Sequence, residues 1–275
     1  MTTKDPQPES TASELFQQLR ALMNRLRGED GCPWDRQQTF QSLTQYTIEE
    51  AFEVLEAVET NDLDELRQEL GDLLFHVLFY SRIAEEQQLF TLEQVIDGIL
   101  RKMIGRHPHV FAQQEGASAT PVQQIIDNWE EHKRRERLLK SGHRPVSVFD
   151  GVSSHLPALI WADKIQDKMA SVGFDWSTAA PVFDKVAEEL EEVKQAAASG
   201  DPSATEEEIG DLLLTVVNLA RHLDVNAEIA LRRSAHKCQQ RFRYIEQRLN
   251  DQGRSPVETS VDEMEQLWQA SKVDR

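Results

Sequence analysis

Apolar residues recur at intervals of three and four positions along most of the chain, a spacing typical of helices that bury one face. One stripe consists of Leu15, Leu19, Leu22, Met23 and Leu26. A second consists of Leu66, Leu70, Leu73, Leu74, Val77 and Leu78. Strict alternation of apolar and polar residues, which would indicate strands, is nearly absent. The pattern therefore predicts an all-α protein.

Capping and turn signals predict where these helices begin and end. Thr11 with Glu14, and Thr47 with Glu50, match the capping-box pattern of a helix start. Pro181 stands where proline is favoured, in a first helical turn. We expect further helices over 62–87, 91–106, 121–140, 157–172, 206–222 and 227–249 and from 261, and loops over 28–35 and 173–176.

Four acidic positions occur twice with the same spacing, each displaced by 139 residues. The first set is Glu50, Glu53, Glu69 and Asp72. The second set is Glu189, Glu192, Glu208 and Asp211. Within each helix the two acids are three residues apart, so both members of a pair share one face. Chance is a poor explanation for a repeat of this kind.

Each acidic set is symmetric about a turn signal. The first set is centred on Asn61-Asp62 and the second on Gly200-Asp201-Pro202. If each segment folds as two antiparallel helices, the four carboxylates meet at one height, roughly 12 Å from the turn at about 1.5 Å per residue. Solvated faces of acidic helices are the alternative for any single glutamate. For a doubled, turn-symmetric set we favour a common site.

Four carboxylates on facing helices repel one another, and burying an unpaired carboxylate costs free energy. A hard divalent cation removes this cost, since Mg²⁺ and Mn²⁺ prefer oxygen ligands and bind substrate phosphates at the same time. The sequence therefore predicts a metal site in each half.

The length of 275 residues predicts two domains, and the 139-residue repeat gives the same number. We expect a disordered tail over 1–13, a helical domain over 14–140, a linker over 141–150 and a second, similar domain over 151–275. The linker is centred on Ser141–Pro145.

The formal net charge of −18 argues against nucleic acid and against an anionic membrane surface as partners. No apolar run reaches the ~18 residues of a membrane span. The first residues are polar, unlike a signal peptide. Cys32 and Cys238 make no disulfide framework, so we expect a cytoplasmic protein.

Basic and aromatic residues also recur near the acidic sets. Lysine and arginine stand four residues apart in two places, at Lys102 with Arg106 and at Lys237 with Arg241. Tryptophan and lysine do the same at Trp129 with Lys133 and at Trp268 with Lys272. A Trp ring can stack on a nucleobase and a Lys can reach a phosphate. Ordinary surface cations and core tryptophans are the alternative. His76 and the pair His107 and His109 we assign structural roles.

Several segments together resemble the MazG family, the two-domain nucleoside triphosphate pyrophosphohydrolases of an all-α superfamily. They are Gly31–Asp35, Glu49–Asp72, Arg106–Phe111, Val172–Trp176 and Glu188–Asp211. The similarity covers roughly residues 14 to 272. It implies Mg²⁺-dependent hydrolysis of NTPs and dNTPs to the monophosphate and pyrophosphate, with Mn²⁺ as a substitute ion. It also implies a homodimer that removes surplus or damaged nucleotides.

The resemblance also implies roles for individual residues. In the second copy the four acids would bind metal, and the nucleotide contacts would be Lys185, Lys237, Arg241, Trp268 and Lys272. The first copy has corresponding candidates in its own acids and in Lys102, Arg106, Trp129 and Lys133. The candidates for a catalytic carboxylate are Glu188, Glu189 and Glu192, and which of them is the base stays open, as does a base or supporting role for Glu49.

We expect the second copy to carry most of the turnover, because Lys185 stands one turn before Glu189 whereas Tyr46 occupies that position in the first copy. Two rival functions are a di-iron carboxylate bundle and a helical scaffold with a relic site. The di-iron class uses Glu-x-x-His, and here the partner at that spacing is aspartate. The intact acids and recurring basic residues disfavour a relic.

Overall fold

The computed structural model describes residues 10–111, 121, 125, 128, 129, 132 and 147–272. These residues form helices joined by turns, and none of them lies in a strand, which confirms the all-α class. The chain divides into two compact units, Met1–His132 and Lys133–Arg275. The expected linker at 141–150 lies largely outside the described residues, so its limits stay a prediction.

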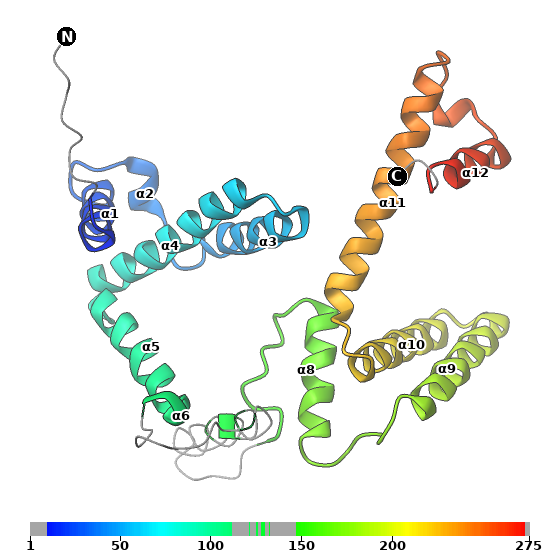
Figure 1. Ribbon diagram of the computed structural model, residues 1–275, viewed down its shortest axis with the longest axis horizontal. Helices are drawn as coiled ribbons and strands as arrows, with labels where there is room; N and C mark the ends of the chain where they lie inside the picture. The colour runs from blue at the N-terminus through cyan, green and yellow to red at the C-terminus, as the bar shows by residue number, and fades with distance from the viewer. Residues whose placement is uncertain are drawn as a thin grey trace. The chain divides into compact units, whose positions relative to one another are not determined.

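The first unit contains two acidic helices between shorter ones (Figure 1). Its elements are α1 (Ala12–Leu26), α2 (Pro33–Gln37), α3 (Thr44–Thr60), α4 (Leu63–Glu86), α5 (Leu92–Arg106) and α6 (Pro108–Phe111). Thr11 and Glu14 form the predicted capping box, so the helix starts two residues inside the expected tail. Of the helix predicted over 121–140, the structure describes five residues.

The second unit repeats the plan (Figure 1). Its elements are α8 (Ala158–Ala170), α9 (Ala180–Ser199), α10 (Pro202–His222), α11 (Ala227–Asn250), the 3₁₀ turn η1 (Pro256–Glu258) and α12 (Val261–Ala270). Helix α10 packs against both α9 and α8, and α11 packs against α12.

The acidic helices of each unit form an antiparallel hairpin, α3 with α4 and α9 with α10 (Figure 1). Each hairpin turns through one left-handed residue, Asn61 with φ 57° and Gly200 with φ 74°. The next residue is an aspartate whose side chain caps the returning helix: Asp62 accepts from the backbone of Asp64 and Glu65. Asp201 does the same in the second unit. These local signals place the acids of the two helices at matching heights.

Three boundaries differ from the sequence-based expectations. Thr47 is not a helix cap, because α3 already begins at Thr44; its hydroxyl donates to the Leu43 carbonyl instead. The segment 28–35 is not entirely a loop, since Pro33 opens the short helix α2. Helix α10 begins at Pro202 rather than at 206, because Asp201 caps it immediately after the turn.

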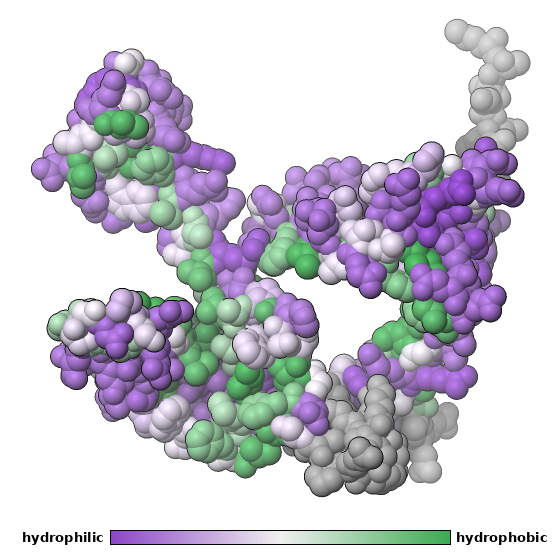
Figure 2. All heavy atoms as spheres, turned by 180° about the vertical axis from the view of Figure 1, so that it is seen from behind, coloured by the Kyte–Doolittle hydropathy of each residue, from purple (hydrophilic) through white to green (hydrophobic). Residues whose placement is uncertain are grey.

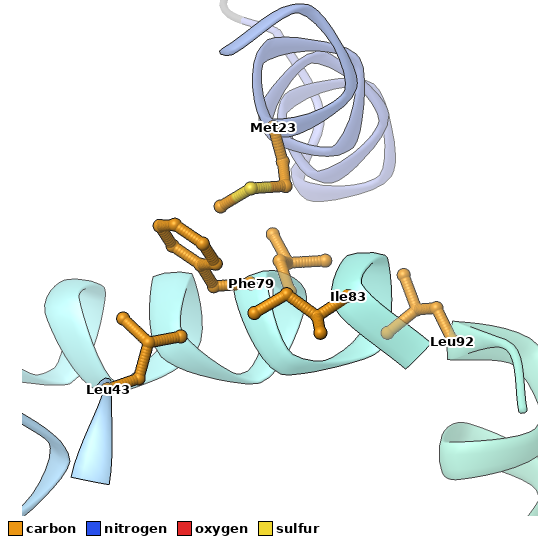
Figure 3. Packing of buried hydrophobic residues seen from close by; sticks show 6 residues of the cluster. Met23, Leu43, Phe79, Ile83 and Leu92 are labelled. Atoms are coloured by element: carbon orange, nitrogen blue, oxygen red, sulfur yellow. The ribbon is translucent and has the colours of Figure 1, made fainter. Parts of the chain in front are cut away.

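The core of the first unit lies where α1 crosses α4. Figure 3 shows Met23 of α1 pointing at Phe79 and Ile83 of α4, and these three side chains are 1–2% exposed. Leu43, Leu78 and Leu92 complete the cluster. Burial of such side chains contributes about 1.5–3 kcal/mol each relative to exposure.

Other residues of the expected core stripes are exposed within a single chain. On α4 these are Leu70, Leu74 and Val77, at 52%, 41% and 44% exposure. The positions 139 residues later are Ile209, Leu213 and Val216 on α10, at 44%, 52% and 43%. Figure 2 shows such apolar surface in both units. The 3.6-residue period identified the apolar face correctly, but these residues are not covered by their own unit.

The hairpin turn of the second unit can be tested by one substitution. Gly200→Ala places a Cβ on a left-handed residue, and since nothing lies within 4 Å of that Cβ, only the backbone conformation is strained. We expect the free energy of unfolding in urea to fall by about 1–2 kcal/mol. The control Gly210→Ala, which also meets nothing within 4 Å but lies inside α10, should stabilise the protein slightly. Equal stability of wild type and Gly200→Ala would contradict this account of the turn.

Candidate metal and nucleotide site

Each hairpin brings carboxylates from both of its helices together. In the first unit the ligand atoms of Glu50, Glu69 and Asp72 lie within 4.8 Å of one another. In the second unit those of Glu189, Glu208 and Asp211 do the same. The two clusters correspond residue by residue at the 139-residue interval. The turn-centred spacing of the sequence is thus realised as two clusters of oxygen ligands.

The fourth acid of each set lies at the edge of its cluster. The charge of Glu53 is one cause that raises the pKa values of Glu50 and Glu69. The charges of Glu189 and Glu208 are among the causes that raise the pKa of Glu192. Both residues therefore share the electrostatic field of the three central carboxylates.

In the first unit, burial and neighbouring acids raise the pKa values of the clustered glutamates. Glu69 is only 7% exposed. Its burial, and then its hydrogen bond with Glu50, raise the pKa of Glu69 to about 7. Burial also raises the pKa of Glu50. The pair therefore loses its last proton at a higher pH than an ordinary glutamate does.

In the second unit a lysine provides the compensating charge. The Lys185 Nζ lies 2.8 Å from an oxygen of Glu189, which is 5% exposed, and 2.9 Å from an oxygen of Glu188. These two hydrogen bonds raise the pKa of Lys185 above its ordinary value. Burial, followed by the charge of Glu189, raises the pKa of Glu192. Lys185 therefore stays charged beside the buried carboxylate.

The first unit has no equivalent of this lysine. Tyr46 stands at the corresponding position and packs edge-on against Trp34, with the ring centroids 5.9 Å apart. The difference noted in the sequence is thus a difference in how the two clusters are neutralised.

Both clusters could hold a divalent cation. They offer only carboxylate oxygens, the ligand type of Mg²⁺ and Mn²⁺. Of their buried members, Glu69 has a pKa raised to about 7 by burial and by neighbouring acids, and Glu189 is paired with the ammonium group of Lys185. The donor chemistry and the unrelieved negative charge therefore suit a hard metal ion.

The basic and aromatic candidates pair with each other. The Arg241 guanidinium lies 5.5 Å from the Trp268 ring centroid, and Arg106 lies 5.9 Å from that of Trp129. Lys272 donates to Gln269 at 2.7 Å. Lys102 and Lys237 are exposed on α5 and α11, and Lys133 lies outside the described residues.

The structure does not bring the basic groups of α11 and α12 to the acids. Within 147–272, no hydrogen bond or ion pair joins Lys237, Arg241 or Lys272 to the second cluster. Of the predicted substrate-binding residues of the second unit, Lys185 contacts an acid of the cluster, Glu189.

The histidines have structural contacts. His76 Nδ1 lies 3.1 Å from the Thr47 hydroxyl. His76 is not one of the residues that form the first carboxylate cluster. His107 Nδ1 lies 2.7 Å from the carbonyl of Met103 and closes the end of α5. Cys32 and Cys238 are free.

Sequence reasoning missed a cavity of about 420 Å³ in the second unit. It is lined by residues from the end of α8, the 173–176 segment and α10, among them Gln166, Phe174, Trp176, Asn218 and Arg221. A usable signal was present, because Asn218 interrupts an apolar stretch of α10 between Val217 and Leu219.

Comparison with known proteins assigns the family. A model of the MazG nucleotide pyrophosphohydrolase domain matches the chain twice, over residues 38–111 and 178–245, and each match contains one acidic hairpin. The chain belongs to the MazG family. This confirms the resemblance read from the sequence and the tandem arrangement of two related helical domains.

Individual relatives match nearly the full length of this chain. The chain is 45% identical to a nucleoside triphosphate pyrophosphohydrolase of Escherichia coli over 257 residues, covering 92% of this chain and 95% of that protein. It is 39% identical to a nucleoside triphosphate pyrophosphohydrolase/pyrophosphatase MazG of Thermotoga maritima over 261 residues, covering 95% and 97%. It also matches YabN of Bacillus subtilis at 38% identity, covering 94% of this chain and 51% of that protein.

Among the described residues, no helix is both long and apolar enough to span a membrane. The cytoplasmic location stays a prediction from the sequence.

The proton held by Glu69 predicts a pH dependence of stability. A folded-state pKa of about 7 against an ordinary 4.5 means that the folded protein binds more protons between these values. Without divalent ions, this group's contribution to the free energy of unfolding is complete below about pH 4.5 and is lost as the pH rises through about 7. In EDTA, the melting temperature of the wild type should fall between pH 5 and pH 8. Glu69→Gln should show a smaller fall. The exposed residue Glu56, changed to Gln, serves as the control. An identical fall in all three proteins would rule out the raised pKa of Glu69.

Proposed function

We propose that this MazG-family enzyme hydrolyses nucleoside and deoxynucleoside triphosphates to the monophosphate and pyrophosphate, with Mg²⁺ as its metal. The observation that carries the proposal is the pair of carboxylate clusters, in each of which three ligand oxygens from two helices lie within 4.8 Å of one another. The names of the relatives from Escherichia coli and Thermotoga maritima support the same reaction class. Removal of surplus or non-standard nucleotides is the role we propose for it.

The metal ligands would be the clustered acids with the fourth acid of each set. They are Glu189, Glu192, Glu208 and Asp211 in the second unit and Glu50, Glu53, Glu69 and Asp72 in the first. Mg²⁺, or Mn²⁺ in its place, would supply charge neutralisation and Lewis acidity at the phosphates. The chain's own groups would bind the nucleotide and take the proton of the attacking water.

Lys185 would change partner during binding. In the structure its ammonium group neutralises Glu189. A cation on the cluster would replace that charge, which leaves the lysine able to bind a phosphate oxygen one turn before the acids. Glu188 lies on the exposed side of Lys185, and with Glu189 and Glu192 it is a candidate for the general base.

A homodimer is the second part of the proposal. The basic residues Lys237, Arg241 and Lys272 have no contact to the second cluster within the described part of one chain. The exposed apolar stripe on α4 and its counterpart on α10 are each a surface that a second copy can cover. A second copy would cover these stripes, and it is the source we propose for cations that complete the phosphate site.

The reaction is tested by product analysis. The purified protein is incubated with each of the common NTPs and dNTPs and Mg²⁺, and the phosphorus products are identified by ³¹P NMR. We expect the nucleoside monophosphate and pyrophosphate in equal amounts, and no turnover in excess EDTA. Formation of the diphosphate with orthophosphate would overturn the cleavage position. Full activity in EDTA would overturn the metal dependence.

The two copies should contribute unequally. Glu192→Gln should remove most of the rate at saturating Mg²⁺ and NTP, whereas Glu53→Gln should remove little, because Lys185 exists only beside the second cluster. A calorimetric titration with Mg²⁺ should show weaker binding for each variant at its own cluster. Glu191→Gln and Glu56→Gln, at exposed positions on the same helices, are the matched controls. A large loss with Glu53→Gln and a small one with Glu192→Gln would reverse the assignment, and equal losses would mean that both copies turn over.

A further inference from the structure

Helix α12 carries Trp268, and Lys272 follows two residues after its end. The helix packs against α11 (Figure 1). None of its ten residues, all of which the structure describes, is buried. Apolar burial therefore holds α12 less firmly than it holds a core helix, and individual polar contacts decide how the helix lies on α11.

One face of α11 is turned toward α12. Arg241, Ile245 and Leu249 follow one another at intervals of four residues and share this face. The Arg241 guanidinium lies 5.5 Å from the Trp268 ring centroid, and Ile245 and Leu249 are 2% and 0% exposed. The position of Trp268 beside Arg241 therefore depends on how α12 is held along this face.

Arg254 ties the start of α12 to the end of α11. Its Nη1 and Nη2 donate to the two carboxylate oxygens of Glu263, at 2.5 and 2.8 Å. Its backbone N–H donates to the Leu249 carbonyl at 3.0 Å, just after Gly253, whose φ of 68° turns the chain back. The backbone of this arginine thus belongs to α11 while its side chain grips α12 in a bidentate pair, which we call the clasp.

Glu263 gives up a local role to form the clasp. Ser260 and Glu263 have the spacing of a capping box, and the Ser260 hydroxyl accepts from the Glu263 backbone N–H at 3.3 Å. In α1 the equivalent acid, Glu14, completes its box by accepting from the backbone of Thr11 at 2.8 Å. Glu263 directs both oxygens to Arg254 instead. Its carboxylate therefore serves the contact between two helices rather than the start of its own helix.

The clasp is charged and partly exposed. Its hydrogen bonds lower the pKa of Glu263 and raise the pKa of Arg254, so both groups stay ionised at neutral pH. The two side chains are 37% and 36% exposed. A pair with this exposure adds little to the stability of a whole domain. It can nevertheless decide the docking of a short helix that has no buried residue.

The sequence provides the clasp in the second copy alone. Trp129 and Lys133 correspond to Trp268 and Lys272 at the 139-residue interval. At the same interval, Arg254 corresponds to Glu115 and Glu263 to Gln124, and residues 112–120 include no arginine or lysine. The first copy therefore has the tryptophan and the lysine without the charged pair that precedes them in the second.

We propose that Arg254 and Glu263 are positioning residues for nucleotide binding, which hold α12 on α11 so that Trp268 and Lys272 meet the nucleotide together with Arg241. The inference rests on the proposed function for the identity of the ligand. Neither residue of the clasp touches the substrate. Opening the clasp weakens binding and leaves the chemical step at the acids unchanged, which raises KM without lowering kcat.

The first test is a set of charge variants assayed with ATP and Mg²⁺. Glu263→Gln keeps the shape of the side chain and should raise KM about fivefold at unchanged kcat. Arg254→Glu places two acids together and should raise KM about tenfold. Combining Arg254→Glu with Glu263→Arg restores the pair in reverse and should return KM to within about twofold of the wild type.

Asp262→Asn is the matched control, because it removes the same charge from the same exposed helical turn outside the clasp. An unchanged KM in Glu263→Gln would overturn the clasp, as would an equal rise in Asp262→Asn or no recovery in the reversed pair. If circular dichroism shows Glu263→Gln unfolded at the assay temperature, Glu263→Asp replaces it. That variant keeps the charge on a shorter side chain, and a KM equal to that of the wild type or of Asp262→Asn would again overturn the clasp.

The second test needs no hydrolysis. The full chain, which has five tryptophans, is labelled with 5-fluorotryptophan, and the ¹⁹F signal of Trp268 is assigned with Trp268→Phe. The signal should move in Glu263→Gln and return in the reversed pair, because the ring leaves Arg241 when the clasp opens. A Trp268 signal that is identical in the wild type and Glu263→Gln would overturn the positioning role.

Calorimetric titration with α,β-methylene-ATP and Mg²⁺ separates the clasp from the reaction. Binding should be about fivefold weaker in Glu263→Gln than in the wild type or in Asp262→Asn. Weakened binding in a protein that hydrolyses no triphosphate would overturn the proposed reaction and retain the clasp. Hydrolysis of triphosphates with the same affinity in all three proteins would retain the reaction and overturn the clasp.

Discussion

Repulsion between carboxylates held at one height on a helical hairpin is the constraint on which both units depend. The helices meet through short turns, at Asn61 and Gly200, and these turns fix which acids face each other. Partial burial then prevents water from screening the charges, as Glu69 and Glu189 show. The charge of the cluster is compensated differently in the two units, with a raised carboxylate pKa in the first and an ammonium group in the second.

Different groups compensate the negative charge of the cluster in the two units. In the first, burial and the neighbouring acids raise the pKa of Glu69 to about 7, and the tyrosine at position 46 adds no charge. The second places the ammonium group of Lys185 against Glu189 and Glu188. If a metal ion bound, as proposed above, the first cluster would lose a proton, whereas Lys185 would keep its charge. The second unit would then have a cation available for a phosphate, and the first has no lysine at that position.

Most of the fold and the composition of the clusters could be predicted because their determinants are local. The apolar period, the capping aspartates and the turn residues all act within a few positions. Thr47 was misassigned as a cap because a turn upstream decides the helix start: Thr39 and Ser42 exchange side-chain to backbone hydrogen bonds just before α3. The exposed stripe on α4 shows a second limit, since the period identifies an apolar face but not what covers it.

The cavity of the second unit could not be predicted, because it depends on three segments that meet only in the folded unit. Gln166 reaches the backbone of α10, and Arg221 reaches back to Asp175, forty-six residues earlier in the chain. In the first copy the residue that corresponds to Asn218 is Phe79, a core side chain that is 2% exposed. The second copy instead retains buried polar atoms without partners, Gln166 Oε1 and Arg221 Nε. Arg221 lies on α10, the helix that also carries Glu208 and Asp211, and Gln166 reaches the backbone of α10 from α8. The cost of these two buried atoms is therefore borne beside the acidic helix, where the first copy has a packed core instead.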